Sequence, residues 1–196
     1  TMFVFASVMM GWLGVVPLAA HGIALQFASI AFMVPLGMSQ AATVRIGRAL
    51  GRGDALALNR AAGSAIVICL LFALMSGLLF WTVPAPLISL FLDTSDAKAA
   101  DVMAYAVPLL AIAGVFQLFD NGQSVGVGLL RGLKDTRVPM LLAIFCYWGI
   151  GFPTAYVLGF VFDFGGVGVW TGLATGLAFA AVFMNGRFLI LRPRLD

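Results

Sequence analysis

Long apolar runs that contain no charged residue constrain this chain more than any other feature of its sequence. A run of about 20 apolar residues can cross the hydrocarbon core of a bilayer as a helix. Only 10% of the 196 residues are charged and 62% are hydrophobic, whereas roughly a quarter of the residues in a soluble domain are charged. The sequence therefore predicts an all-α integral membrane protein and excludes a soluble globular domain.

Six apolar runs are predicted to be membrane helices of one bundle, which makes residues 1–196 a single transmembrane domain. They cover residues 1–14, 18–42, 61–82, 101–130, 138–161 and 165–187. Residues 1–14 lack the basic start of a secretory signal and lead directly into further apolar sequence. We interpret them as the remainder of a truncated helix. Residues 43–60 alternate arginines with isoleucine and leucine, which is typical of a segment lying on an anionic membrane surface.

The distribution of basic residues predicts the orientation of the helices. Ten of the eleven lie in three clusters that are separated by two spans each. The clusters are Arg45, Arg48, Arg52 and Arg60; Arg131, Lys134 and Arg137; and Arg187, Arg192 and Arg194. The intervening connections hold Lys98 and the acids Asp93, Asp96, Asp101 and Asp163. Because loops rich in lysine and arginine stay in the cytoplasm, the basic clusters and the C-terminus are predicted to be cytoplasmic.

Asp120 is the candidate functional residue. It is the one acid predicted to be buried within a span, and the chain contains no glutamate. It precedes Arg131 by eleven residues. This spacing places Asp120 ~16 Å from Arg131 along the helix axis, near the middle of a ~30 Å hydrocarbon core. A carboxylate there costs at least ~2.5 kcal/mol, so it is expected to face a cavity or a partner. Burial favours the protonated form and a bound cation favours the ionised one, which suits exchange of a proton for a cation.

Other polar and aromatic residues extend the predicted site. Gln117, Asn121 and Ser124 share a helix face with Asp120 at helical spacing and form a polar stripe that could hold water or a cation such as sodium. Tyr147 and Trp148 offer aromatic faces to an organic cation, although aromatic residues are also ordinary packing material. The structural alternative for Asp120 is a protonated or bridging carboxyl group that joins two helices.

The remaining features favour helix packing over chemistry. Cys69 and Cys146 lie in apolar runs without a histidine, acid or second cysteine at ligand spacing, and His21 is interpreted as a hydrogen-bonded histidine near the outer end of its span. Small residues allow close approach of helix backbones. Such stripes consist of Gly168, Gly172 and Gly176 in one span and of Gly122 and Gly126 in another. Three prolines within spans predict kinks or breaks that could line a transport pathway: Pro35, Pro108 and Pro153.

Four sequence blocks resemble the C-terminal half of the multidrug and toxic compound extrusion (MATE) family, in its NorM-like bacterial branch. The blocks are AAHGIAL at 19–25, FMVPLGMSQAATVRIGRALGRGD at 32–54, FQLFDNGQSVGVGLLRGLKDTRVPM at 116–140 and YWGIGFPTAY at 147–156. The resemblance implies a twelve-helix exporter of two lobes in a bacterial inner membrane, in which this chain supplies helices seven to twelve. It also implies efflux of amphipathic or cationic drugs in exchange for sodium or protons, without an enzymatic reaction.

The resemblance also assigns the coupling acid. The membrane-embedded acid of helix ten falls on Asp120, whereas the glutamate that NorM-like proteins carry in helix seven would lie at or before Thr1. The alternative within the same superfamily is a flippase for lipid-linked oligosaccharides, whose anionic cargo favours basic residues in the cavity. No predicted span contains a buried lysine or arginine. An intramembrane protease needs paired acids or clustered metal ligands, and the sequence offers neither.

Overall fold

A computed structural model describes residues 2–92 and 97–192 of the chain. The predicted positions of Thr1, Asp93, Asp96 and Arg194 lie outside these residues. The described residues are all-helical, as predicted. The helices are α1 (Met2–Leu13), α2 (Val15–Gly51), α3 (Ala55–Thr82), α4 (Pro84–Ser89), α5 (Ala99–Gly132), α6 (Arg137–Ile144), α7 (Phe152–Tyr156) and α8 (Gly165–Leu191), with π-helical segments η1 (Phe145–Gly151) and η2 (Val157–Val161).

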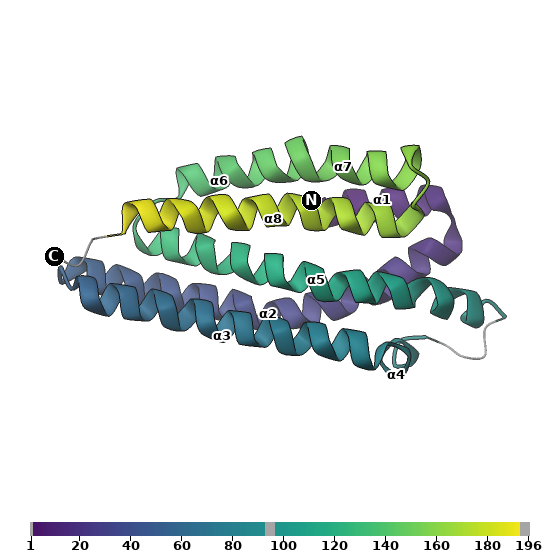
Figure 1. Cartoon of the computed structure of the whole chain (residues 1–196), viewed down its shortest axis with the longest axis horizontal. Helices are drawn as coiled ribbons and strands as arrows, with labels where there is room; N and C mark the ends of the chain where they lie inside the picture. The colour runs from purple at the N-terminus through teal and green to yellow at the C-terminus, as the bar shows by residue number, and fades with distance from the viewer. Residues whose placement is uncertain (1, 93–96, 193–196) are drawn as a thin grey trace.

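Five helical columns in the described part of the chain are long and apolar enough to cross a membrane. They are α2, α3, α5, α8 and the continuous column from α6 through η2. Figure 1 shows these columns lying lengthwise beside one another, with α4 at one end of the bundle. The two longest, α2 and α5, have 37 and 34 residues. At ~1.5 Å per residue both exceed the ~30 Å hydrocarbon core, so their ends extend into the headgroup region or beyond it.

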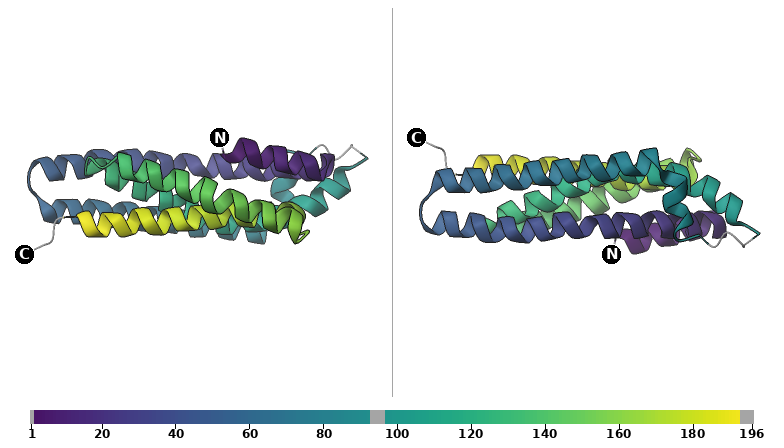
Figure 2. Two further views of the ribbon diagram at one scale, coloured as in Figure 1. Left: turned by 90° about the horizontal axis from the view of Figure 1, so that it is seen from above. Right: turned by 90° about the horizontal axis from the view of Figure 1, so that it is seen from below.

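The basic residues gather at one end of this bundle. The C-terminal ends of α2, α5 and α8 and the N-terminal ends of α3 and α6 meet there, at the left of Figure 1 and again at the left of both views in Figure 2. Two of the predicted clusters lie at these helix ends, and so do Arg187 and Arg192 of the third. The structure thus collects the separated basic segments on one side of the membrane domain.

The segment from 43 to 60 was predicted to lie on the membrane surface, and this prediction is wrong. Helix α2 continues through it to Gly51, and α3 begins at Ala55 after a tight turn. Gly53 enters the left-handed region at φ 66°, and the Asp54 N–H returns to the carbonyl of Ala49 at 3.0 Å. The Asp54 carboxylate then accepts the N–H of Ala57 at 2.8 Å, which caps α3. Local capping therefore extends two membrane helices where alternating charge suggested a separate segment.

Helices α5 and α8 form the centre of the bundle. Helix α5 packs against α2, α3 and α8, and α8 also packs against the α6–η2 column. The glycine stripe in α8 makes the second contact possible: a Cβ atom on Gly172 would lie 2.2 Å from the Cα of Ala155, and one on Gly176 would lie 2.8 Å from the Cα of Gly151. The prediction that this stripe serves close helix packing is confirmed.

The prolines within spans have different consequences. Helices α2 and α5 continue through Pro35 and Pro108 without interruption. Pro153 lies in the five-residue helix α7 between the two π-helical segments, so irregular helix surrounds this proline. The π-helical turns are rare and frequently occur at functional sites. The segment η1 also carries Tyr147, one of the predicted site residues.

Candidate functional site in the membrane bundle

A cavity of about 400 Å³ lies between α1, α2, α5, η1 and α8. Among the described residues that line it, Asp120 is the one that carries a charge. The other lining residues are Met2, Phe3, Leu25, Ala28, Ser29, Phe32, Met33, Phe116, Gln123, Tyr147 and Leu177. This lining is mostly apolar and aromatic with a few polar groups, the usual composition of small-molecule sites. The cavity could accommodate an amphipathic compound beside one carboxyl group.

Asp120 is only 7% exposed and lies in the middle of the central helix α5. Among the described residues, none donates a hydrogen bond to its carboxyl group or forms an ion pair with it. A buried carboxylate without a partner is costly, so it is neutralised by a proton or by a bound cation. The structure therefore offers no support for a bridging role in which Asp120 joins two helices.

The three polar residues predicted beside Asp120 are buried, but they do not line its cavity. The Gln117 amide points to α2, where it donates to the carbonyl of Ala28 at 3.5 Å. Asn121 donates to the backbone carbonyl of Gln117 at 2.7 Å and borders a smaller cavity on the α3 side of α5. Its side-chain oxygen is buried and, among the described residues, lacks a hydrogen-bond donor.

Ser124 takes part in the contact between α5 and α2. Its backbone carbonyl accepts the hydroxyl of Ser39 at 2.8 Å, and one turn further on the Thr43 hydroxyl donates to the carbonyl of Gly128 at 2.9 Å. A Cβ atom on Gly128 would lie 2.4 Å from the Ser39 carbonyl oxygen, so the two backbones touch at this point. The end of the polar stripe nearest the basic helix ends thus holds two helices together.

Of the two aromatic residues singled out from the sequence, Tyr147 lines the cavity with Asp120 and Trp148 does not. Trp148 is exposed and packs edge-on against Phe5 with ring centroids 4.9 Å apart. Sequence reasoning missed Gln123 and Ser29, which also line the cavity. Gln123 follows Asp120 by three residues and therefore shares a helix face with it, so its spacing carried a usable signal.

His21 connects three helices beside the cavity. It is buried at 1% exposure, and its Nδ1 accepts the indole N–H of Trp170 from α8 at 3.1 Å. Its Nε2 lies 3.1 Å from the hydroxyl of Ser7 in α1, and that hydroxyl donates to the carbonyl of Phe3 at 3.0 Å. Phe3 is itself a wall of the cavity. His21 is hydrogen-bonded, as predicted, and it fixes α1 against α2 and α8.

Comparisons with known proteins place this architecture in a family. The sequence is 51% identical over its whole length to the probable multidrug resistance protein NorM of Rhizobium meliloti and 53% identical over 99% of its length to that of Agrobacterium fabrum. The chain spans about 42% of the length of each of these relatives. Its fold matches the crystal structure of the eukaryotic MATE transporter AtDTX14 with a TM-score of 0.83 and 24% identity, over 98% of this chain and 42% of that one.

The pattern of the MatE family covers residues 1–157, which include α1 to α7 and Asp120. This match extends over well more than half of the chain, and it agrees with the curated relatives and with the shared fold. The predicted resemblance is therefore confirmed, and the chain is a multi-pass membrane protein. On this evidence, the chain belongs to the MatE family.

Proposed function

We propose that this chain is the C-terminal lobe of a two-lobe exporter that drives multidrug efflux by antiport. Its cargo is amphipathic or cationic, its coupling ion is sodium or a proton, and it catalyses no chemical reaction. The observation that carries the proposal is the Asp120 carboxyl group, which is buried near the middle of the membrane-spanning helix α5 beside a mostly apolar cavity and has no hydrogen-bond or ionic partner among the described residues. Such a residue is a functional candidate by default.

The coupling follows from the cost of an uncompensated charge. In a low-dielectric cavity, Asp120 is stable when a proton or a cation neutralises it. A positively charged drug in the same cavity offers an alternative neutralising charge, so binding of the drug and binding of the coupling ion compete. Competition for one carboxylate links the exit of the drug to the entry of the ion, which is antiport.

The remaining polar residues have supporting roles in this proposal. Tyr147 presents an aromatic ring and a hydroxyl group to the cavity, and Gln123 adds an amide. Gln117, Asn121 and Ser124 neighbour the coupling residue along α5 but lie outside its cavity. The unpaired oxygen of Asn121, at the smaller cavity, is a second candidate ligand for a sodium ion. The basic end of the bundle is proposed to face the cytoplasm, because positive loops remain on that side.

The alternative function is a flippase for lipid-linked oligosaccharides. An anionic diphosphate cargo favours lysine or arginine in the cavity, and none lines it among the described residues. An acidic cavity instead attracts cations. The charge of the site therefore favours the antiporter over the flippase.

The experiment that tests the proposal is efflux of a fluorescent organic cation by the full-length transporter in vesicles. An imposed sodium gradient is compared with an imposed proton gradient of equal size. Export driven by one of the two gradients is expected, and it identifies the coupling ion. The absence of export under either gradient contradicts the antiporter and favours the flippase. Since a cavity between two lobes needs both of them, residues 1–196 alone are expected not to transport.

A further inference from the structure

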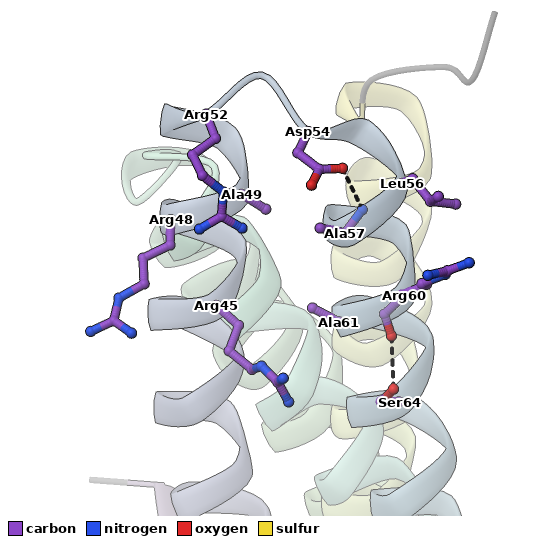
Figure 3. Close-up of a pocket in the computed structure, with 10 residues that line it drawn as sticks. All are labelled: Arg45, Arg48, Ala49, Arg52, Asp54, Leu56, Ala57, Arg60, Ala61 and Ser64. Carbon is purple, nitrogen blue, oxygen red and sulfur yellow. Dashed lines mark hydrogen bonds between the residues drawn. The ribbon is translucent and has the colours of Figure 1, made fainter.

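A second cavity, which we call the arginine cleft, lies between α2 and α3 at the basic end of the bundle. Its volume is about 450 Å³. Its charged and polar lining residues are Arg45, Arg48, Arg52, Asp54, Arg60 and Ser64. Figure 3 shows Arg45 reaching into the space between the two helices and Arg52 folding back along α2, while Arg48 and Arg60 extend outward, away from that space. We propose that the arginine cleft binds the phosphate headgroup of an anionic phospholipid.

The charges of the cleft are not balanced within the described part of the chain. None of the four guanidinium groups forms an ion pair or a side-chain hydrogen bond there. Asp54, the acid beside them, already caps α3 through the Ala57 N–H. The arginines at the C-terminal end of α8 differ, because Arg187 pairs with Asp135 and Arg192, just after the helix, donates to Asn59. An external anion is therefore the missing counterpart of the arginine cleft.

The cleft reaches inward from the helix ends, as a site for a lipid phosphate requires. Arg45 precedes the end of α2 at Gly51 by six residues, which corresponds to ~9 Å along the helix axis. The lining on α3 continues to Ser64, nine residues after its start at Ala55. The cleft thus extends from the helix ends toward the hydrocarbon core, whereas a site for a freely dissolved anion needs only the helix ends.

An apolar surface continues from the cleft toward the middle of the membrane. The face of α3 that carries Arg60 and Ser64 continues at helical spacing with large exposed apolar residues. These residues are Val67, Ile68, Leu71, Met75 and Leu78, each between 47% and 63% exposed. The arginine cleft fits the phosphate of a phospholipid, and the apolar strip next to it on α3 fits the acyl chains. Basic pockets between helices on the cytoplasmic side bind anionic headgroups.

The tendency of basic loops to remain in the cytoplasm predicts excess positive charge at this end, but it does not predict that four arginines line one cleft. Arg131 and Arg137 obey the same rule, are exposed and lie outside the cleft. They provide a matched control, since their removal changes the net charge of this end by the same amount. A cationic drug is an unsuitable occupant of the arginine cleft, because the four guanidinium groups repel a positively charged compound.

The test is native mass spectrometry of the full-length transporter with phosphatidylglycerol, with phosphatidylcholine of the same acyl chains, and with inorganic phosphate as competitor. The unmodified protein is expected to bind phosphatidylglycerol preferentially, in a manner that millimolar phosphate does not displace. R45Q/R52Q is expected to weaken this binding on the order of tenfold. R131Q/R137Q is expected to change it less than about twofold, because these residues lie outside the cleft.

A charge-preserving variant separates loss of the site from loss of the fold. R45K/R52K keeps both positive charges and is expected to retain most of the preference for phosphatidylglycerol. Equal weakening in R45Q/R52Q and R131Q/R137Q overturns the proposal, since it indicates attraction by overall surface charge. Displacement by inorganic phosphate also overturns it, because the site then recognises a free anion. These outcomes are independent of drug efflux, which uses the cavity at Asp120.

Discussion

The indole N–H of Trp170 donates a hydrogen bond to Nδ1 of His21 at 3.1 Å, and this contact fixes the tautomer of the histidine. An indole nitrogen is only a donor, so Nδ1 must carry the lone pair and Nε2 the hydrogen. The Ser7 hydroxyl donates to the Phe3 carbonyl and therefore accepts from Nε2. His21 is thus neutral and uses both ring nitrogens to hold α1 and α8 against α2.

Replacement of this histidine tests its structural role. His21→Phe retains a planar ring but leaves the buried Trp170 N–H without an acceptor, and it is expected to lower the free energy of unfolding by about 1–3 kcal/mol. Thermal unfolding of the purified protein measures the change. The double variant H21F/W170F is expected to lose less than the sum of the single variants, because the unpaired indole is then absent. Additive losses contradict the proposed contact.

Asp120→Asn is expected to abolish coupled efflux in the full-length transporter while expression remains close to that of the unmodified protein. The amide has the same shape but cannot bind a proton or hold a cation by charge. No hydrogen bond of the carboxyl group is lost among the described residues, so stability should not fall. Asp101→Asn is the matched control at the exposed start of the same helix and should transport normally. Undiminished transport by Asp120→Asn contradicts the coupling role.

Tyr147 and Trp148 are adjacent in sequence but differ in their access to the cavity, so they form a matched pair. Tyr147→Ala removes an aromatic face from the cavity and is expected to weaken binding of an aromatic cation by about two- to fivefold. Trp148→Ala lies outside the cavity and is expected to have little effect on this affinity. Fluorescence anisotropy of a bound dye gives both dissociation constants. A larger effect at Trp148 places the drug elsewhere.

Gly172→Ala tests the close contact between α8 and α7. The added methyl group would lie 2.2 Å from backbone atoms of Ala155, which cannot move independently of their helix. Overpacking of this kind is expected to cost about 1–3 kcal/mol and to lower the melting temperature. Gly186→Ala in the same helix is the control, because its methyl group has no described neighbour within 4 Å. Equal melting temperatures for the two variants contradict the packing role.

The ion pair between Asp135 and Arg187 joins the α5–α6 turn to α8. The Arg187 side chain is 34% exposed and that of Asp135 is 15% exposed, so solvent screens the interaction. Asp135→Asn is expected to reduce stability by less than about 1 kcal/mol, and the reduction should diminish further at high salt. Chemical denaturation at two ionic strengths measures both effects. A loss of several kcal/mol that is independent of salt contradicts this assignment.

Several features of the protein could be predicted from the sequence because they depend on composition and local order. Charge-free runs determine the all-α membrane class, since lipid offers no partner for exposed backbone polar groups. The order and spacing of the four sequence blocks predict the family. The position of Asp120 within a span marks the candidate site, because burial of a carboxylate is costly wherever the neighbouring helices lie.

Only the tertiary structure decided which side chains share a cavity. Helical spacing placed Gln117, Asn121 and Ser124 beside Asp120, but the packing of α2 and α3 on different faces of α5 separates them, and Gln123 joins the site instead. The arginine cleft also required the fold, because capping by Gly53 and Asp54 brings α2 and α3 together there. The sequence determines what it costs to bury each residue, whereas the neighbours of that residue depend on how separate helices pack.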